Sequence, residues 1–367
     1  MSDGNQKVLM KGNDAIAEAA LRAGCRAYFG YPITPQNELI AYMASHMFDR
    51  GGIFIQAESE IAAINMVFGA SAAGARAMTS SSSPGISLKQ EGISYAAGAD
   101  IPLVVVNVVR GGPGLGSISA SQADYFQATR GGGHGDYRCI VLAPKSVQEC
   151  ADLTCLAFEL SDKYRMPAIL LADGIIGQMM EGVVLPPDID PATLPRRPWT
   201  VGHMDTRIDE PEEAGAALRP LARHLTSINL VPELLEAQNR RRNARYEEVE
   251  AAETRYESSE AGGELTLVAY GTCARIALGA QQLAANEGIK LSLFRPITLW
   301  PFPYKQLADF AGTGKPILTV EMSMGQLVED VKLSILGASP IHLLSHSGGV
   351  IPTEEEVFAE AKKILGK

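Results

Sequence analysis

Short apolar runs alternate with capped or alanine-rich segments along the first half of the chain. The run LVVVNVV at 103–109 is apolar and β-branched over nearly its whole length, which is typical of a central parallel strand buried on both faces. The pattern predicts strands over 26–30, 52–56, 76–80, 103–109 and 168–171. It predicts helices over 15–23, 36–47, 59–74, 83–97 and 146–163. This alternation, over about residues 8–185, indicates an α/β domain with a doubly wound parallel sheet.

Several of these segments begin at residues that favour a helix start. Asn13 or Asp14 is a suitable N-cap for the first helix. Ser83, followed by proline, is a suitable N-cap for the fourth, and the segment SVQE at 146–149 matches a capping box. The segment YPITP at 31–35 cannot be helical, because each proline restricts the residue before it, so we expect a rigid loop.

A proline-rich stretch separates the first block from the rest of the chain. Five prolines fall between residues 186 and 198, so we expect a first domain over residues 1–185. A proline-rich, charged and helical connector is expected over 186–262, and a smaller α/β domain over 263–367. Its predicted strands are 265–271, 290–294 and 316–321, and its predicted helices are 274–286, 303–310 and 326–335. The arginine triplet at 240–242 could bind a phosphate, but a solvated helix face or a face against a partner is favoured.

Composition restricts the class of protein. The chain has 367 residues, of which 46% are hydrophobic and 20% charged, as expected for a globular protein of more than one domain. The net charge of −10 disfavours binding to a nucleic-acid backbone. The five cysteines are scattered, without the spacing of a disulfide framework, a zinc site or an iron–sulfur site. We find neither a secretion signal nor an apolar run long enough for a bilayer, so we expect a cytoplasmic protein without nucleic-acid or membrane partners.

Four candidate features directly follow predicted strands of the first domain. They are Thr34, Glu60, the serines at 80–83 and Arg110. In doubly wound sheets, ligands bind beyond the carboxyl ends of the strands, so these residues are expected to share one rim. The serines lack a G-x-S-x-G elbow, so helix capping explains them better than catalysis. His134 lies in a glycine-rich loop, where a mobile loop residue is favoured over a ligand contact.

Arg110 and Glu60 each have two interpretations at this stage. Arg110 could hold a substrate carboxylate through two parallel hydrogen bonds, or it could pair with an acid to fix the glycine-rich segment after it. That segment lacks the register of a nicotinamide site. Glu60 begins a small and apolar helix, where burial would raise the pKa of its carboxyl group and the helix dipole would lower it. It could share a proton with a ring nitrogen, or it could be an ordinary first-turn acid beside Glu58.

Eight ordered motifs resemble the α subunit of 2-oxoacid:ferredoxin oxidoreductases, and the similarity covers nearly the whole chain except the connector. The motifs of the first domain are KGND (11–14), GYPITP (30–35), QAESEIAA (56–63), TSSSSPG (79–85), RGGPG (110–114) and QADY (122–125). In the second domain, FRPITLWPF (294–302) and EMSMGQL (321–327) resemble the family's transketolase C-terminal-like domain.

The resemblance implies a fold and an activity. The fold is a thiamine-diphosphate-binding-type pyrimidine domain plus a smaller transketolase C-terminal-like α/β domain. The activity is oxidative decarboxylation of a 2-oxoacid with thiamine diphosphate and coenzyme A, which gives acyl-CoA, CO2 and reduced ferredoxin. By motif, Glu60 would be catalytic and bind N1′ of the aminopyrimidine. Thr34 and Arg110 would bind the substrate, and Pro32 and Ile33 would contact the cofactor.

The resemblance also implies that the chain works with partner subunits. The family's diphosphate and Mg2+ site needs a Gly-Asp-Gly segment and a downstream asparagine, but the similar piece ADG at 172–174 has no asparagine until Asn229. A β subunit is therefore expected to hold the diphosphate, Mg2+ and a 4Fe–4S cluster, and this chain to hold no metal. Gamma and ferredoxin-like delta subunits and ferredoxin are further expected partners.

The substrate type that the motifs resemble most is the branched-chain 2-oxoisovalerate type, followed by the 2-oxoglutarate type. Two other classes of function remain as alternatives. The chain could be a non-catalytic scaffold subunit, or a hydrolase or acyltransferase that uses a serine or Cys139.

Overall fold

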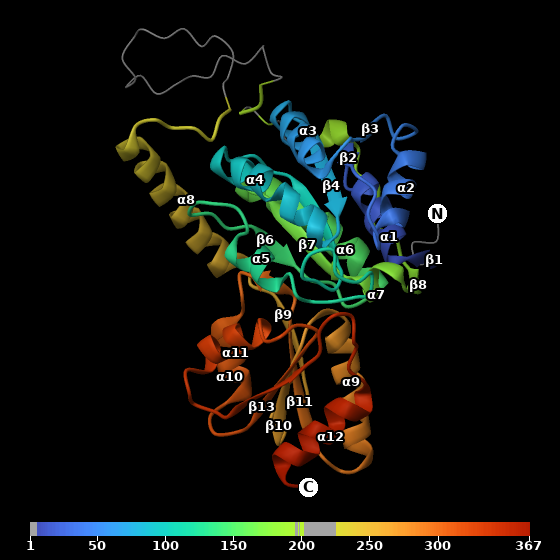
Figure 1. Ribbon diagram of the computed structural model, residues 1–367, viewed down its shortest axis with the longest axis vertical. Coiled ribbons are helices and arrows are strands. Elements are labelled where there is room, and N and C mark those ends of the chain that lie inside the picture. Colours follow the sequence, from blue (N-terminus) through green and yellow to red (C-terminus); the bar gives the residue numbers. More distant parts are fainter. Residues whose placement is uncertain (1–5, 195–196, 198, 202–224) are drawn as a thin grey trace.

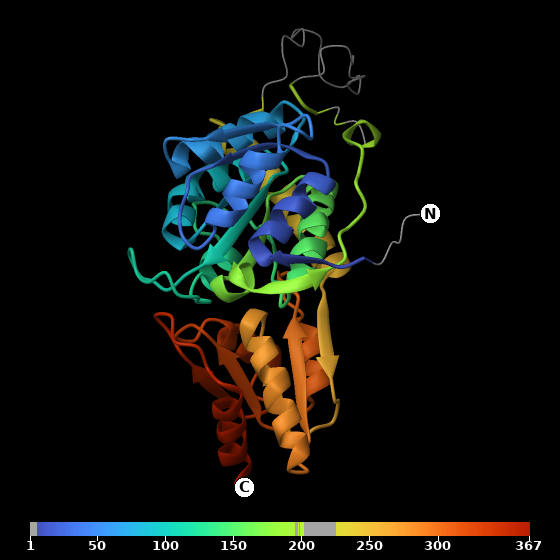
Figure 2. The same cartoon turned by 90° about the vertical axis from the view of Figure 1, so that its right-hand side faces the viewer.

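The computed structural model describes residues 6–194, 197, 199–201 and 225–367, which form two α/β units (Figure 1). The amino-terminal unit contains a seven-stranded sheet, and the carboxyl-terminal unit contains a five-stranded sheet. Figure 2 shows the two units stacked end to end, with β9 entering the second unit from the first. The part of the predicted connector at 202–224 lies outside the described residues.

The amino-terminal sheet is parallel except at one edge. Its strands are β2 (Cys25–Gly30), β3 (Ile53–Gln56), β4 (Arg76–Ser81), β5 (Val104–Val109), β6 (Ile140–Leu142), β7 (Ala168–Asp173) and β12 (Thr298–Trp300). The order is β12-β6-β7-β5-β4-β2-β3, and only β12 runs antiparallel to its neighbour. The predicted run at 103–109 is therefore the central strand, as expected. The doubly wound parallel sheet is also confirmed.

Helices cover both faces of this sheet. They are α1 (Gly12–Arg22), α2 (Asn37–His46), α3 (Glu60–Ala72), α4 (Ser83–Gly98), α5 (Tyr125–Arg130), α6 (Val147–Tyr164) and α7 (Gly174–Gln178). Helix α1 packs against α2 and α6 on one face, and α3 packs against α4 on the other. A two-stranded ribbon of β1 (Val8–Lys11) and β8 (Met180–Val183) lies beside them.

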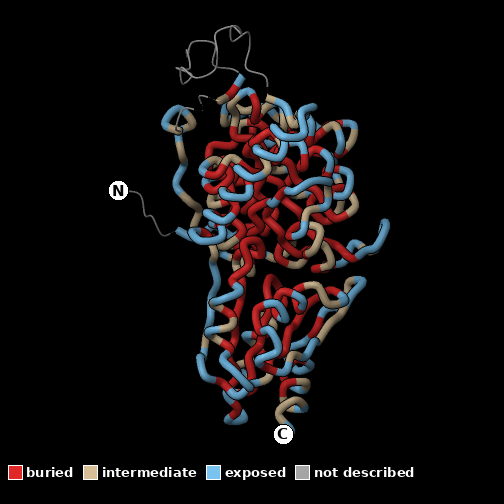
Figure 3. The backbone as a smooth tube through the Cα atoms, turned by 90° about the vertical axis from the view of Figure 1, so that its left-hand side faces the viewer, coloured by how far each residue is buried: buried red, intermediate tan, exposed pale blue. Residues whose placement is uncertain are grey.

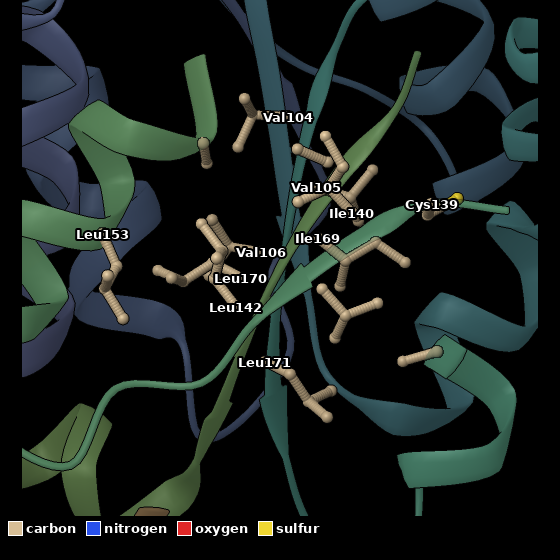
Figure 4. Packing of buried hydrophobic residues seen from close by; sticks show 14 of the residues in the cluster. Val104, Val105, Val106, Cys139, Ile140, Leu142, Leu153, Ile169, Leu170 and Leu171 are labelled. Carbon is tan, nitrogen blue, oxygen red and sulfur yellow. The ribbon is translucent and has the colours of Figure 1, made fainter. Parts of the chain in front are cut away.

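The core of the amino-terminal unit is built from β5, β6 and β7. In Figure 4 the side chains of Val106 and Leu170 lie on one side of the sheet, while Val105 and Ile169 lie on the other. This alternation explains why the strands read as continuous apolar runs, because both faces need apolar cover. Figure 3 shows the buried residues concentrated along the middle of each unit.

The carboxyl-terminal unit is smaller. Its strands are β9 (Tyr256–Ser259), β10 (Leu265–Val268), β11 (Leu291–Pro296), β13 (Ile317–Glu321) and β14 (Ile341–Ser345), in the order β14-β13-β10-β11-β9. Its helices are α9 (Gly271–Asn286), α10 (Tyr304–Ala311), α11 (Leu327–Ile335) and α12 (Glu354–Leu365). Strand β9 is antiparallel to β11, and the other pairs are parallel.

The described part of the connector comprises the short helix η1 (Pro191–Thr193) and the long helix α8 (Pro232–Glu253). Two arginines of the basic triplet, Arg241 and Arg242, pair with Asp100 at N–O distances of 3.1 and 3.3 Å, and Arg245 joins them at 2.6 Å. The third, Arg240, pairs with an acid of its own helix. Arg241, Arg242 and Arg245 therefore dock α8 on the amino-terminal unit, so the solvated face expected for the triplet is found only at Arg240.

Gln122 joins the two units. Its backbone N–H donates to the Met322 carbonyl at 2.9 Å. Its side-chain amide donates to the Tyr270 carbonyl at 2.9 Å and accepts from the Met322 N–H at 3.0 Å. Because Gln122 is only 1% exposed, these bonds form away from water, where an unmade bond would cost most.

Three predicted helix starts differ from the structure. Helix α1 begins at Gly12 with Lys11 as its N-cap, so the expected caps at Asn13 and Asp14 are wrong. Asn13 instead donates from inside the helix to the Pro35 carbonyl at 2.8 Å. Ser83 is the first residue of α4, one position after the N-cap, because its hydroxyl bonds to the backbone of Arg110.

The third difference is at α6, where only half of the capping box forms. The Ser146 hydroxyl accepts from the Glu149 N–H at 3.2 Å. The Glu149 carboxylate, however, accepts from the N–H of Lys145 and pairs with Arg295 of the carboxyl-terminal unit. A contact between the two units thus replaces the second half of the local motif.

Helices α3 and α4 pack against each other (Figure 1). Their closest approach involves two glycines of α4. A Cβ at position 92 would lie 2.6 Å from Cγ1 and Cγ2 of Ile64 on α3, nearer than carbon atoms approach. A Cβ at position 85 would lie 2.6 Å from Glu60 Oε1 and 2.1 Å from Ser81 Oγ. We call this pair of contacts, at Gly85 and Gly92, the glycine contact. It fixes how α3 lies over α4.

We predict that Gly92→Ala destabilises the chain by about 1–3 kcal/mol, because the added methyl group overpacks the helix contact. Gly69→Ala is the matched control, since Gly69 lies on an exposed part of α3 and no atom lies within 4 Å of its Cβ position. Alanine there should stabilise the chain by up to about 1 kcal/mol through helix propensity. Urea unfolding of the two variants measures both effects. Equal effects at positions 69 and 92 would contradict a close contact.

Candidate functional site

Glu60 is a buried acid at the start of α3. The Ser59 hydroxyl caps this helix by accepting from the Ala62 N–H at 3.1 Å, and Glu60 is the first helical residue. Glu60 is 6% exposed, whereas Glu58 is exposed. Within the described part of the chain, no hydrogen bond reaches the Glu60 carboxylate. Glu60, not Glu58, is therefore the nearly buried acid whose carboxylate has no hydrogen-bond partner among the described residues.

The surface under Glu60 is made by Gly85 and the serines after β4. Because Gly85 has no side chain, the Glu60 carboxyl group lies directly over the first turn of α4. The hydroxyl groups of Ser81 and Ser82 are buried and have no partner among the described residues. Unpaired buried hydroxyls are costly, so Ser81 and Ser82 are unusual polar groups for this position.

Arg110 is held by carbonyl groups rather than by an acid. Its NH1 donates to the Thr34 carbonyl at 3.0 Å and its NH2 to the Leu115 carbonyl at 2.9 Å. Its Nε is buried without a partner, and no ion pair of Arg110 occurs in the described ranges. Since Arg110 is 9% exposed, its charge is nearly buried and uncompensated. This arrangement favours an anionic ligand over the loop-holding salt bridge.

The loop that carries Thr34 is held by the buried side chain of Gln36. The Ser80 hydroxyl donates to Gln36 Oε1 at 2.5 Å, and Gln36 Nε2 donates to the Tyr31 carbonyl at 3.3 Å. The Thr34–Pro35 peptide is cis, and Thr34 Oγ1 accepts from the exposed Asn37 at 3.2 Å. The predicted rigid loop is thus observed, with Pro32 exposed and Ile33 half-buried on it. Sequence analysis missed Gln36, which is fully buried.

A second missed network joins the strand ends of β4 and β5. Asn107 Oδ1 accepts from the Ser83 N–H at 3.2 Å, and Asn107 Nδ2 donates to Asp124 Oδ2 at 2.8 Å. Burial raises the pKa of Asp124, while hydrogen bonds from Ser83 and Asn107 oppose the rise. The signal in the sequence was the asparagine that interrupts LVVVNVV, since a polar residue inside a buried strand needs partners.

The sequence candidates therefore fall into two groups. Thr34 and Arg110 are in direct contact through the Thr34 carbonyl. Glu60 joins the same rim through Gly85 and the serine run, whose Ser83 bonds to the Arg110 backbone. His134 lies elsewhere, where its carbonyl accepts from Ser94 at 2.8 Å near the end of α4.

Three candidate nucleophiles for a hydrolase or acyltransferase are hydrogen-bonded or unreactive. The Ser80 hydroxyl donates to Gln36 and that of Ser83 donates to the Arg110 carbonyl, so neither is a free nucleophile. The expected capping role of this run is nevertheless wrong, because α4 has no side-chain cap. Burial raises the pKa of the Cys139 thiol to about 12, which suppresses the reactive thiolate.

Asp173, the acid of the ADG segment, is also occupied. Its carboxylate accepts from the Thr272 N–H at 2.8 Å, the Thr272 hydroxyl at 2.6 Å and the Ile176 N–H at 3.2 Å. These bonds hold α7 and the start of α9 together across the two units. In the ranges that the structure describes, no group of three or more His, Cys, Asp or Glu side chains could hold a metal ion. Nor is any described helix both long and apolar enough to cross a bilayer.

The surface beside Glu60 is apolar and uncovered. Ile61 of α3 and Leu88 of α4 are each 49% exposed, and Ile53 and Ile55 are exposed on the edge strand β3. Helix α3 is apolar on nearly all sides, a composition typical of a helix that is covered all round. Exposed apolar residues of this size are typical of interaction surfaces, so α3, α4 and β3 each offer apolar side chains to a protein partner.

Comparisons with known proteins agree with this geometry. Residues 18–252 match the family model described as pyruvate flavodoxin/ferredoxin oxidoreductase, thiamine diphosphate-binding. Residues 263–357 match the pyruvate:ferredoxin oxidoreductase core domain II. Over 98% of both chains, the protein is 46% identical to the ketoisovalerate oxidoreductase subunit VorB of Methanothermobacter marburgensis.

Two solved structures resemble the whole chain. One is a 2-oxoglutarate:ferredoxin oxidoreductase from Magnetococcus marinus with 2-oxoglutarate, coenzyme A and succinyl-CoA bound. It superimposes with a TM-score of 0.84 and 31% identity over 98% of this chain and 65% of that chain. The other, a split-gene transketolase described as an inactive β4 tetramer, has a TM-score of 0.57 and 14% identity over 97% of this chain and 98% of that one. The second likeness shows a transketolase-like fold.

The comparisons confirm the resemblance seen in the motifs. Both family models match, one relative is 46% identical, and one solved structure has the same fold over nearly the whole chain. This chain belongs to the 2-oxoacid:ferredoxin oxidoreductase family, as an α-type subunit with a thiamine diphosphate-binding domain.

Proposed function

We propose that the chain is the α subunit of a thiamine-diphosphate-dependent 2-oxoacid:ferredoxin oxidoreductase that converts a 2-oxoacid and coenzyme A to acyl-CoA, CO2 and reduced ferredoxin. The observation that carries the proposal is the position of Glu60, which is 6% exposed at the start of α3 and whose carboxylate lies over Gly85 without a hydrogen-bond partner among the described residues. A carboxylate held in place without a protein partner is free to bond to a ligand.

The residues around Glu60 fit the aminopyrimidine half of the cofactor. The ring nitrogen N1′ needs an acid, and the amino group of the ring needs polar partners. Glu60 and the nearby Ser81 and Ser82 hydroxyls are the proposed partners, and Gly85 gives the Glu60 carboxyl group the room to lie there. The exposed Pro32 and half-buried Ile33 of the rigid loop are the proposed apolar contacts for the ring.

In this proposal Glu60 shares a proton with the pyrimidine nitrogen N1′. The bound thiamine diphosphate supplies a nucleophilic carbon for the 2-oxo group and takes up the electrons released with CO2. Glu60 supports this chemistry by holding or releasing one proton at N1′ from a fixed position at the helix start. A proton held at a fixed position beside the ring nitrogen can be transferred without moving the side chain.

Thr34 and Arg110 are proposed to orient the substrate. Arg110 is nearly buried, makes no ion pair in the described ranges, and has its NH1 and NH2 fixed by carbonyl groups, so its uncompensated charge is the proposed attraction for the substrate carboxylate. The Thr34 hydroxyl lies on the same loop and can donate to the oxo or carboxyl oxygen, since it accepts but does not donate in the structure.

A β subunit is proposed to complete the site. Helices α3 and α4 and strand β3 carry exposed apolar residues, and Ile61 is next to Glu60 in the chain. A subunit docked on these residues would be close to the proposed cofactor site. The diphosphate, Mg2+ and a 4Fe–4S cluster are assigned to that subunit, because Asp173 is committed to bonds between the two units of this chain. Gamma and ferredoxin-like delta subunits and ferredoxin are the further partners in this proposal.

A branched-chain substrate such as 2-oxoisovalerate is favoured over 2-oxoglutarate. The loop after Arg110 presents exposed Leu115 and Ile118, and the sequence has no lysine or arginine from 111 to 129. A substrate with a second carboxylate would need a second cation. The alternative, a 2-oxoglutarate enzyme, would take that cation from a partner. The identity of 46% to a ketoisovalerate oxidoreductase subunit also favours the branched-chain substrate.

We predict that Glu60→Gln lowers kcat of the reconstituted complex by about 10²–10⁴-fold, because an amide cannot share the proton. Glu58→Gln is the control, since Glu58 is exposed and should keep nearly full turnover. Steady-state assays of ferredoxin reduction measure both variants. Unchanged turnover in Glu60→Gln would favour the non-catalytic scaffold, and activity of this chain without thiamine diphosphate would favour a hydrolase.

We predict that Arg110→Lys lowers kcat/KM by roughly 10- to 100-fold on every 2-oxoacid alike, because the carboxylate that Arg110 pairs with is common to all of them. Assays of the reconstituted complex on 2-oxoisovalerate, 2-oxoglutarate, pyruvate and an arylpyruvate test this. The wild type should prefer 2-oxoisovalerate. A loss confined to 2-oxoglutarate would instead assign Arg110 to a side-chain carboxylate, and a wild-type preference for 2-oxoglutarate would overturn the branched-chain assignment.

A further inference from the structure

Lys89 is a fully buried lysine beside Glu60. It is 0% exposed and lies on α4 one turn beyond Gly85, on the face that packs against α3. Its Nζ donates to Thr79 Oγ1 at 3.1 Å and to the backbone carbonyl of Glu60 at 3.3 Å. No carboxylate lies within ion-pair distance of Lys89 in the described ranges.

This position is costly for an ammonium group. Lysine is rarely fully buried without an ionic partner, and a leucine or methionine would fill the same space between two apolar helices. Burial lowers the pKa of Lys89 to about 7, and the Glu60 charge opposes this effect. The side chain therefore changes its charge in the physiological pH range, inside the glycine contact.

The glycine contact couples Lys89 to Glu60. Gly85 brings the Glu60 carboxyl group onto α4, and Gly92 brings α3 equally close one turn after Lys89. Lys89 lies between these two glycines and bonds to the residue whose carboxyl group is unpaired. In such a water-poor contact, a charge on one group changes the proton affinity of the other.

We infer that Lys89 is a positioning residue for Glu60. Its amino group contacts the first turn of α3 at the Glu60 carbonyl, and its charge state controls how readily Glu60 and the pyrimidine nitrogen take up their shared proton. The inference rests on the proposed function of Glu60 and adds a second titrating group to it.

The sign of the effect follows from the charges that face Lys89. From α3 the facing charged group is Glu60, and from β4 the contact is the uncharged Thr79. When Lys89 is protonated, its positive charge disfavours the proton that Glu60 and N1′ share. When Lys89 is neutral, this penalty disappears. Proton sharing at Glu60 should therefore increase as the pH rises through about 7.

We predict three distinct pH profiles for exchange of the thiamine C2 proton in the loaded complex, measured by quenched-flow NMR without 2-oxoacid. After correction for the intrinsic pH dependence, the wild-type rate should rise about tenfold between pH 6 and 8, as a group with a pKa of about 7 loses its proton. Lys89→Met, which is neutral throughout, should be high and flat. Lys89→Arg, which stays charged, should be low and flat.

Lys7→Met is the matched control, because it removes the same charge from an exposed position and should keep the wild-type profile. A wild-type-like profile in Lys89→Met would overturn the inference. If Lys89→Arg does not fold, as judged by circular dichroism, the comparison of wild type with Lys89→Met still tests whether Lys89 causes the pH dependence.

A second readout needs neither cofactor nor turnover. NMR titration of the full chain labelled at lysine should show Lys89 with a pKa near 7, and Glu60→Gln should lower that pKa by about one pH unit, since the Glu60 charge is then lost. An unchanged Lys89 pKa in Glu60→Gln would refute the coupling, even if Glu60 is catalytic. Full turnover in Glu60→Gln would instead refute the proposed function, even if the two groups are coupled.

Discussion

The glycine contact between α3 and α4 is the constraint on which the site depends. Gly85 leaves no side chain between the helices, so the carboxyl group of Glu60 reaches the first turn of α4 instead of turning out to water. Any larger residue there would meet Glu60 and Ser81 at once. The same contact encloses Lys89 and leaves the outer side of α3 uncovered. The position of Glu60, the burial of Lys89 and the uncovered outer side of α3 are thus all linked to one close approach of two helices.

Around that contact, the chain places polar residues where an ordinary core would be apolar. Asn107 stands inside the central strand, Gln36 is buried below the proline loop, and Arg110 carries a nearly buried charge. Each is fixed by a hydrogen bond. Asn107 accepts from the Ser83 N–H, Gln36 accepts from the Ser80 hydroxyl, and Arg110 donates to the Thr34 carbonyl. Arg110 Nε and the hydroxyls of Ser81 and Ser82 remain buried without a partner among the described residues. Most of the polar groups of this region are therefore hydrogen-bonded within the chain, and these few are the exceptions.

The sheet of the first unit was predictable because its strands are apolar on both faces. The central position of 103–109 and the parallel order follow from that pattern, and the structure confirms both. Strand β12 could not be predicted, since it has three residues and pairs with β6 from a segment more than 150 positions earlier. The helix caps failed for a related reason, because Asn13 and Ser83 bond to distant backbone groups rather than to their own helices. Local propensity cannot foresee a tertiary partner.

The site was predictable only in part. Residue types and their places after strands were enough to select Thr34, Glu60 and Arg110 as candidates. The motif favoured Glu60 over Glu58, and the structure adds that Glu60 is buried while Glu58 is exposed. Lys89 was not foreseen, because a lysine in a helix reads as a solvated residue unless the neighbouring helix is known. Asn107 could have been found from its own pattern, as the one polar residue of an apolar strand. Polar residues that interrupt a buried run are therefore a better guide to a network than polar residues at helix ends.

The motifs shared with the family also have a structural meaning. Gln122 and Tyr125 of the QADY motif, with Glu321 and Gln326 of the EMSMGQL motif, bond across or beside the contact between the two units. The carboxyl-terminal unit further packs Gly348 against Gly111, so it borders the loop in which the Leu115 carbonyl holds Arg110. A unit that contributes no reactive side chain to the rim thus shapes the loop that orients Arg110. Residues far from Glu60 in sequence and space can therefore change the site by moving this loop, without touching any ligand.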